Sequence, residues 1–158
     1  MIMTKISNFD IEILEIREAG EADSDALASL VAERGFDYPT ENSLLRGRLK
    51  DLTAAGDRVL VADYDSEIIG MILLHRTRFL HRLTDGRISS LVVSEKYRSS
   101  GVGARLLDAA ESVFRNWGCA RIEVSSGIRR ELAHKFYVRA GFSEQPKRFI
   151  KNLDGKSK

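Results

Sequence analysis

The chain has 158 residues, of which 43% are hydrophobic and 30% charged, and such a chain can bury roughly 70% of its unfolded surface around one core. Its net charge of +2 provides no general field that would favour nucleic acid or an anionic membrane as a partner. The single cysteine excludes an internal disulfide, and three scattered histidines argue against a metal centre. No apolar run reaches the ~20 residues that cross a bilayer, so we expect a single-domain cytoplasmic protein.

The first third of the sequence predicts one strand and two helices. Isoleucines that alternate with acidic residues at 10–17 favour a half-buried strand. Capping residues at 23–25 introduce an apolar helical face that stops at Gly35. Leucines at helical spacing after Thr40 predict a second helix, which ends at Gly56.

The middle of the sequence predicts a hairpin, a further strand and a helix. Two apolar runs, 58–65 and 67–79, are separated by a short polar junction, so the two strands should pair antiparallel. A third β-branched run occupies 88–93 after a basic connector. From Val102 the apolar residues recur on one helical face until Gly118 provides a C-terminal stop.

The last part of the sequence predicts a short strand at 121–126, a helix at 131–140 closed by Gly141, and a final strand at 148–153. Residues 154–158 are expected to fray. No repeat or proline-rich linker divides the chain, so we expect one domain over its whole length. The predicted order βααβββαβαβ indicates an α+β or mixed α/β fold, in which helices cover a single sheet.

The stretch KYRSSGVGARLL joins the third β-branched run to the best-patterned helix. A strand that enters a glycine-rich turn and then a helix leaves backbone N–H groups unpaired at the positive end of the helix dipole. Gly101 and Gly103 lack Cβ atoms that would keep a ligand away, Ser99 and Ser100 add hydroxyls, and Arg98 adds a charged donor. The first helical turn contains no acidic residue. The stretch therefore predicts a phosphate site, although a ligand-free turn with a serine cap fits the local pattern too.

Two nucleotide-binding motifs can be compared with this turn. The Walker A motif needs a lysine followed by Ser or Thr after its last glycine, whereas Ala104 and Arg105 follow here. The dinucleotide fingerprint needs a third glycine at the position of Leu106. Neither motif matches.

The segment Arg98-Ser-Ser-Gly-Val-Gly-Ala104 resembles the Arg/Gln-x-x-Gly-x-Gly/Ala signature of the GNAT superfamily of N-acetyltransferases. ELAHKFYVRAGF resembles helix 4 of that family, with its Tyr-x-x-x-Gly-Phe ending, and the order of elements matches over about 9–153, which we take as the ordered core. The resemblance implies an α+β (mixed α/β) GNAT fold. It has a central, mostly antiparallel sheet of six to seven strands and about four helices, and strands 4 and 5 splay apart.

The resemblance also implies a cofactor, acetyl-CoA, which acts as cosubstrate. Its pantetheine arm would lie along the splayed strand like an added strand, held by main-chain hydrogen bonds. Many relatives have a cofactor-binding asparagine where this chain has Arg130, which cannot accept a hydrogen bond, so that contact is lost or replaced by phosphate or substrate binding. The other residues implied in cofactor binding are Leu91, Val92, Val93, Arg98, Ser99, Ser100, Gly101, Val102, Gly103 and Ala104.

Acetyl transfer to an amine needs alignment, stabilisation of an oxyanion and protonation of the departing thiolate. The family resemblance places Tyr137 at the general-acid position, although its spacing also suits an aromatic that only packs the helix. Glu123 is a candidate general base or, equally, a solvent-facing strand residue. Asp37 and Tyr38 are expected at the rim of the acceptor pocket.

The leading functional hypothesis is an N-acetyltransferase that moves the acetyl group of acetyl-CoA to a primary amine by direct attack through a tetrahedral intermediate. The alternatives are a CoA-binding regulatory module without catalysis, which the presence of Tyr137 disfavours, and a small nucleotide-binding or interaction domain with a coincidental glycine turn. The sequence does not identify the acceptor amine. Pairing of sheet edges could give a homodimer.

Overall fold

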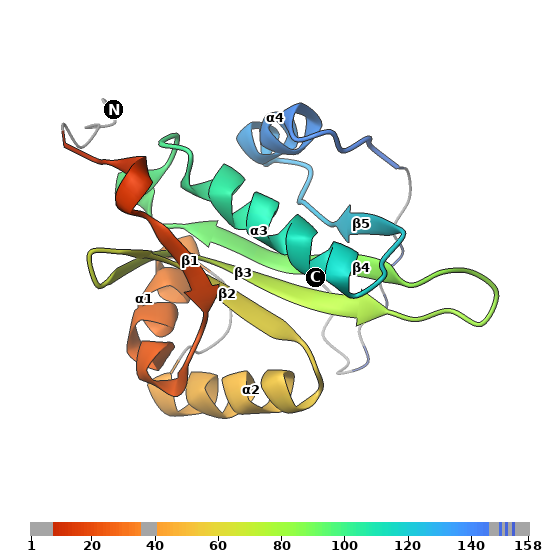
Figure 1. Ribbon diagram of the computed structural model, residues 1–158, viewed down its shortest axis with the longest axis horizontal. Helices are drawn as coiled ribbons and strands as arrows, with labels where there is room; N and C mark the ends of the chain where they lie inside the picture. The colour runs from red at the N-terminus through yellow and green to blue at the C-terminus, as the bar shows by residue number, and fades with distance from the viewer. Residues whose placement is uncertain (1–7, 36–40, 146–148, 150, 152, 154–158) are drawn as a thin grey trace. The chain divides into compact units, whose positions relative to one another are not determined.

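A computed structural model describes residues 8–35, 41–145, 149, 151 and 153 of the chain. It divides into two compact units, Met1–Ser125 and Ser126–Lys158. The first unit holds the whole sheet and three α-helices, and the second holds one α-helix (Figure 1). Among the described residues, no helix combines the length and the apolar character needed to cross a membrane.

The sheet of the first unit has five strands in the order β1-β2-β3-β4-β5. Each of the first four strands pairs antiparallel with its neighbour, and β5 pairs parallel with β4. The mixed, mostly antiparallel sheet expected from the sequence is therefore confirmed. The strands are β1 (Glu15–Glu18), β2 (Arg58–Tyr64), β3 (Glu67–Thr77), β4 (Asp85–Val93) and β5 (Arg121–Val124).

The helices lie where the apolar periodicity predicts them. They are α1 (Ser24–Arg34), α2 (Asn42–Ala54), α3 (Val102–Asn116) and, in the second unit, α4 (Glu131–Arg139). Gly35 and Gly118 follow α1 and α3 with φ of +74° and +71°, a backbone conformation that glycine adopts without strain. The hairpin turn of Asp65 and Ser66 has positive φ at both residues, which matches the twist of the strands it joins.

Helices cover both faces of the sheet, because alternate strand residues point to opposite sides. Leu27 and Leu49 from α1 and α2 pack with Val59 and Met71 on one face. On the other face Gly86 lies so close to the ring of Phe114 that a Cβ atom would be 2.4 Å from it, so α3 can approach β4 only at a glycine. Figure 1 shows α1 and α2 together on one side of the sheet and α3 on the other.

Two strand predictions were wrong in detail. The strand expected at 10–17 begins only at Glu15, because the Asp10 carboxylate accepts the N–H of Glu12 and folds Ile11–Ile13 into a 3₁₀ turn. The sheet has five strands over the described residues and not the six to seven expected. Of the final strand predicted at 148–153, the described residues 149, 151 and 153 are not in a strand, and the side chains at 149 and 153 are almost fully exposed.

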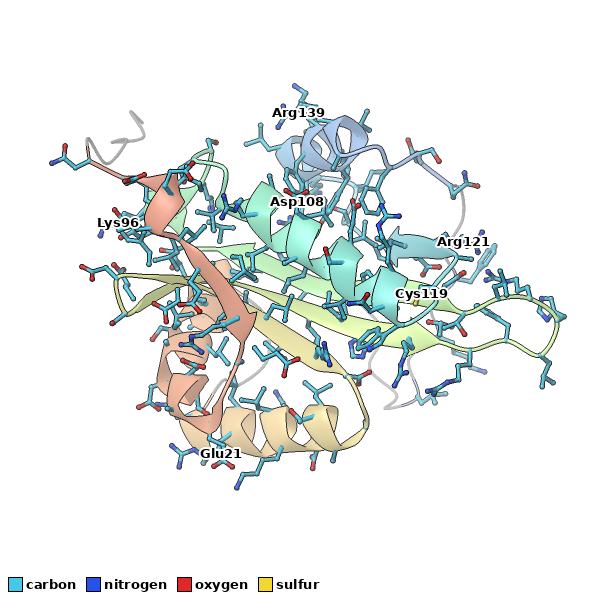
Figure 2. All side chains as sticks on the ribbon, viewed as in Figure 1. Glu21, Lys96, Asp108, Cys119, Arg121 and Arg139 are labelled. Carbon is cyan, nitrogen blue, oxygen red and sulfur yellow. The ribbon has the colours of Figure 1, made fainter. Side chains whose placement is uncertain are left out.

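A buried carboxylate fixes the start of the parallel pairing. Asp85, with a side chain only 2% exposed, accepts hydrogen bonds from Arg82 at 2.8 Å and from Arg121 at 2.9 Å. Burial opposes ionisation of this carboxyl, but the bonds from Arg121 and Arg82 outweigh it and lower the pKa of Asp85 below its ordinary value of 3.8. Figure 2 shows Arg121 at the beginning of β5.

The β4–β5 ladder runs only from the pair Asp85–Arg121 to the pair Ile88–Val124, whereas β4 continues to Val93. The splay between strands 4 and 5 expected from the sequence is therefore confirmed. One edge of β4 from residue 89 onward extends past the end of β5.

We expect Asp85→Asn to lower the free energy of unfolding at pH 7 by about 2–4 kcal/mol, because two arginines lose their buried counter-charge. The ionised Asp85 stabilises the fold above its ordinary pKa, and this contribution is lost as the pH falls through the lowered pKa of the folded state. The gap between wild type and variant in urea unfolding should therefore be constant above about pH 4 and narrow below it. Asp108→Asn, on the exposed side of α3 (Figure 2), is the matched control and should change little.

Candidate active site

The glycine-rich turn between β4 and α3 has an unusual backbone. Ser99 has a φ of +60°, although it is not glycine, and Gly101 has a φ of +93° at the N-cap of α3. A left-handed conformation at two positions turns the chain sharply from the strand into the helix. The first turn of α3 contains no acidic residue, so nothing negative from its own sequence occupies the positive end of the helix dipole.

The backbone N–H groups of this turn are free over six consecutive residues. In the described part of the chain, no protein acceptor binds the N–H of Ser99, Ser100, Gly101, Val102, Gly103 or Ala104. The first N–H of the helix to find a partner is that of Arg105, which donates to the Gly101 carbonyl at 3.1 Å. A row of free donors at a helix N-terminus is an arrangement that binds phosphate groups. We call residues 98–104 the amide cradle.

Two side chains of the amide cradle bind the protein itself. The hydroxyl of Ser100 donates to the carbonyl of Tyr97, and Arg98 Nε donates to the carbonyl of Val93 at 3.2 Å. These bonds shape the turn and leave the other guanidinium nitrogens of Arg98, an exposed side chain, available for an anion.

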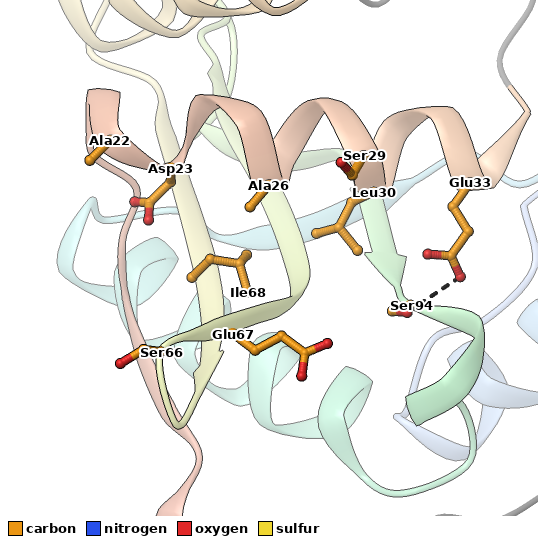
Figure 3. A pocket seen from close by; sticks show the side chains of 10 residues that line it. All are labelled: Ala22, Asp23, Ala26, Ser29, Leu30, Glu33, Ser66, Glu67, Ile68 and Ser94. Atoms are coloured by element: carbon orange, nitrogen blue, oxygen red, sulfur yellow. Dashed lines mark hydrogen bonds between the residues drawn. The ribbon is translucent and has the colours of Figure 1, made fainter.

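The segment that leads into the amide cradle is held from two sides. The buried Tyr97 donates its hydroxyl to Glu67 of β3 at 2.8 Å, and burial together with this bond raises the pKa of Tyr97. Glu33 of α1 accepts the hydroxyl of Ser94 at 3.4 Å and also the N–H of Glu95 (Figure 3). The start of the turn is thereby fixed to α1 and to β3.

The cavity in Figure 3, of about 470 Å³, does not suit an anion. Asp23, Glu33 and Glu67 contribute carboxylates to its wall. Each of these carboxylates already accepts a hydrogen bond from the protein, as Asp23 does from Arg17 at 2.8 Å. The cavity is negative and its charges serve the fold.

The residues expected to face the pantetheine arm lie on the exposed length of β4. Leu91, Val92 and Val93 pair with β3 on one side and extend past the end of β5 on the other. The Val92 side chain is buried against the core, and those of Leu91 and Val93 are half-buried. Their backbone edge is the part that a ligand adding like a strand would use.

A second cavity, of about 420 Å³, lies between the sheet and the helices α1 and α2. Its wall is apolar apart from Arg48 of α2 and Ser90 of β4. Within the described residues no carboxylate pairs with Arg48. Sequence reasoning missed Arg48, because one arginine on an amphipathic helix looks like a solvated surface residue. The apolar residues of the wall are Leu27, Val31, Leu45, Leu49, Leu52, Val59, Met71 and Leu73.

Polar side chains continue this face of the sheet beyond the cavity. The Glu123 carboxylate, a candidate base, forms an ion pair with Arg87, and Arg87 Nη2 also lies 3.5 Å from Ser125 Oγ. His75 of β3 lies between Asp57, 2.9 Å from its Nδ1, and Ser89 of β4, 2.7 Å from its Nε2. The sequence alone did not reveal the group of Asp57, His75 and Ser89, because its three members come from separate segments.

The other predicted site residues belong to the second unit or to undescribed segments. Tyr137 is half-buried on α4, with its ring centroid 5.2 Å from that of Phe136 and 5.5 Å from that of Phe142. Arg130 is the exposed N-cap residue of the same helix. Asp37 and Tyr38 lie outside the described residues.

Comparison with known proteins gives a consistent result. Residues 24–142 match the model of the acetyltransferase (GNAT) family. An aminoalkylphosphonate N-acetyltransferase of Salmonella typhimurium strain LT2 is 30% identical over 154 residues, which cover 97% of this chain and 100% of the relative.

Solved structures share the fold. A Trypanosoma brucei acetyltransferase has a TM-score of 0.77 and 23% identity, over 89% of this chain and 99% of that one. The aminoglycoside N-acetyltransferase AAC(6')-Iy in complex with CoA has a TM-score of 0.78 and 15% identity, over 88% of this chain and 93% of that one.

Proposed function

The chain belongs to the acetyltransferase (GNAT) family and is an acyl-CoA-dependent N-acetyltransferase, and we propose that it transfers the acetyl group of acetyl-CoA to a small primary amine that carries a phosphonate. The observation that carries the cofactor part is the row of six free N–H groups in the amide cradle. The observation that carries the acceptor part is the guanidinium of Arg48, an exposed side chain without a carboxylate partner among the described residues, beside a cavity whose other polar lining residue is Ser90. The likeness to an aminoalkylphosphonate N-acetyltransferase along the whole chain supports the same acceptor class.

In this proposal the diphosphate of acetyl-CoA binds the free N–H groups of the amide cradle, with Arg98 and the helix dipole adding positive charge. The pantetheine arm then follows the backbone of Leu91, Val92 and Val93, where β5 has already ended. Arg130 adds a second cation for the phosphates or the acceptor.

The acetyl transfer itself needs few protein groups. The neutral amine attacks the thioester carbonyl, the C–N bond forms as a tetrahedral intermediate, and the C–S bond then breaks. Tyr137 donates its phenolic proton to the departing thiolate, as the family resemblance implies. A CoA-binding module without catalysis would not need this group.

The acceptor would lie in the second cavity, with its anionic end on Arg48. A guanidinium presents paired N–H donors that match two oxygens of a phosphonate. The apolar wall would hold the short alkyl chain. Ser90 of β4 lines the cavity on the side where the amine has to meet the thioester.

We expect Gly101→Ala to weaken acetyl-CoA binding at least tenfold in isothermal titration, because an alanine at positive φ costs roughly 1–2 kcal/mol and shifts the N–H groups that it carries. Gly118→Ala is the control, since it imposes the same strain at the other end of α3 and should lower stability without a change in affinity. Equal effects of both substitutions on affinity would contradict the assignment of the amide cradle.

We expect Tyr137→Phe to lower kcat at least tenfold and to leave the affinity for acetyl-CoA almost unchanged, because only the proton donor is removed. Release of the CoA thiol in a coupled assay gives the rate. Tyr64→Phe, which removes a hydroxyl with only long hydrogen bonds, serves as the comparison. Unchanged turnover of Tyr137→Phe would remove this residue from the mechanism.

The acceptor class can be tested with short aminoalkylphosphonates and alkylamines of equal length. The phosphonates should be acetylated with the higher kcat/KM, and Arg48→Gln should raise their KM about tenfold or more without changing that of the uncharged amines. Arg46→Gln, an exposed arginine on the same helix, is the matched control. Acetylation of peptides or aminoglycosides but not of phosphonates would refute the acceptor, whereas no binding of acetyl-CoA would refute the function.

A further inference from the structure

We propose that Asp57, His75 and Ser89 form a proton relay that deprotonates the acceptor amine, with His75 as the general base and Ser89 as the group that touches the substrate. The inference rests on the proposed acetyl transfer. An amine acceptor arrives mostly as an ammonium ion, which has no lone pair to attack a thioester. A base close to β4 therefore completes the reaction.

The order of atoms decides which nitrogen of His75 is the base. The Asp57 carboxylate lies 2.9 Å from Nδ1 in an ion-pair contact, and its negative charge favours a proton on that nitrogen. The proton of the neutral ring is therefore on Nδ1, and Nε2 has a free lone pair. Ser89 Oγ, 2.7 Å from Nε2, donates its hydroxyl proton to that lone pair.

A β-bulge aims Ser89 at the histidine. In the β3–β4 ladder Leu73 pairs with Ser90 and Leu74 with Ile88, so Ser89 is an additional residue without an opposite partner. Bulges change the direction of a side chain and are enriched next to active sites. Ser89 is exposed, whereas His75 and Asp57 are only 25% and 20% exposed, so the serine hydroxyl is the end of the relay that faces solvent.

The bulge occurs where the two proposed ligands meet. Ser89 is the first residue of β4 beyond its last pair with β5, which is where the pantetheine path begins. Its neighbour Ser90 lines the second cavity, together with Leu73 and Val59. His75 lies two residues after Leu73 on β3, and Asp57 lies two residues before Val59, immediately ahead of β2, so both continue the face of the sheet that Leu73 and Val59 share.

The proton transfer balances in one step. The ammonium N–H bond breaks as its proton passes to Ser89 Oγ, while the former hydroxyl proton of Ser89 passes to His75 Nε2. The products are a neutral amine, an unchanged serine and an imidazolium ion, whose charge Asp57 compensates at Nδ1. The charged groups beside His75 are Asp57 and, opposite it on β4, Arg87.

Glu123 is a weaker candidate for the base. Its carboxylate forms an ion pair with Arg87, and uptake of a proton would remove the negative charge on which that pair depends. His75 Nε2, in contrast, already faces a hydroxyl that can exchange protons with a substrate.

The first test does not depend on activity. Long-range ¹H–¹⁵N NMR of ¹⁵N-histidine-labelled protein should show the Nδ1–H tautomer for the ring whose signals disappear in His75→Gln. The Nε2–H tautomer on His75 would overturn the proposal, even if the enzyme acetylates amines. Intact-protein mass spectrometry with acetyl-CoA alone should show no acetyl group on Ser89, and an acetylated Ser89 would indicate a nucleophile in place of a relay.

The kinetic test compares pH profiles. We expect His75→Gln to lower kcat/KM about 100-fold at pH 7 with unchanged acetyl-CoA affinity, and this loss should shrink as the pH approaches the amine pKa of about 10. Ser89→Ala should show the same pattern, and Ser89→Thr, which restores the hydroxyl, should recover most of the rate. His81→Gln, an exposed histidine of the β3–β4 connection, is the control.

If His75→Gln lowers kcat/KM by the same factor at all pH values, His75 has a structural role and the relay is overturned. The relay is also overturned if His75→Gln has normal activity while Glu123→Gln is inactive. A wild type that binds no acetyl-CoA and acetylates no amine would instead refute the proposed function, and the NMR result would then still decide the state of His75.

Discussion

The buried carboxylate of Asp85 determines where β4 and β5 pair. It accepts from Arg121 at the first pair of the parallel ladder and from Arg82 in the preceding connection, so the pairing begins at a defined position. A ladder that begins there and ends at Ile88 leaves β4 from residue 89 onward without a strand partner on that side, as far as the described residues go. A buried charge is costly in a small protein unless it is paired, and here two arginines compensate it at the first residue pair of the ladder.

The free edge, the bulge and the amide cradle follow one another along a single segment. From residue 89 the chain passes the bulge, the uncovered backbone of β4 and the turn into α3 within sixteen residues. The left-handed conformation of Ser99 would be an unfavourable feature without a role. Tyr97 and Glu33 hold the entrance of this segment, so an anion would meet a preformed turn.

The sequence predicted the elements well, because the apolar periods and glycine stops of this chain depend on neighbours close in sequence. It predicted the sharp strand-to-helix turn at 98–104 for the same reason, and the phosphate site there stays a prediction. The strand prediction failed at 11–13, where one aspartate cap outweighed an alternating pattern. The sequence also could not show the contacts of His75, because its partners Asp57 and Ser89 are 18 and 14 residues away. Those contacts depend on strand register and on a bulge, and neither leaves a local signal.

The arrangement explains why an imidazole suits this position better than a second carboxylate. The phosphonate proposed for the acceptor and the phosphates of the cofactor are both anions, and a further unpaired carboxylate beside them would repel both. In the proposed relay the only carboxylate is that of Asp57, and His75 gains its positive charge beside it when it takes the proton. The relay therefore changes from a net charge of −1 to zero as it takes the proton of the ammonium ion.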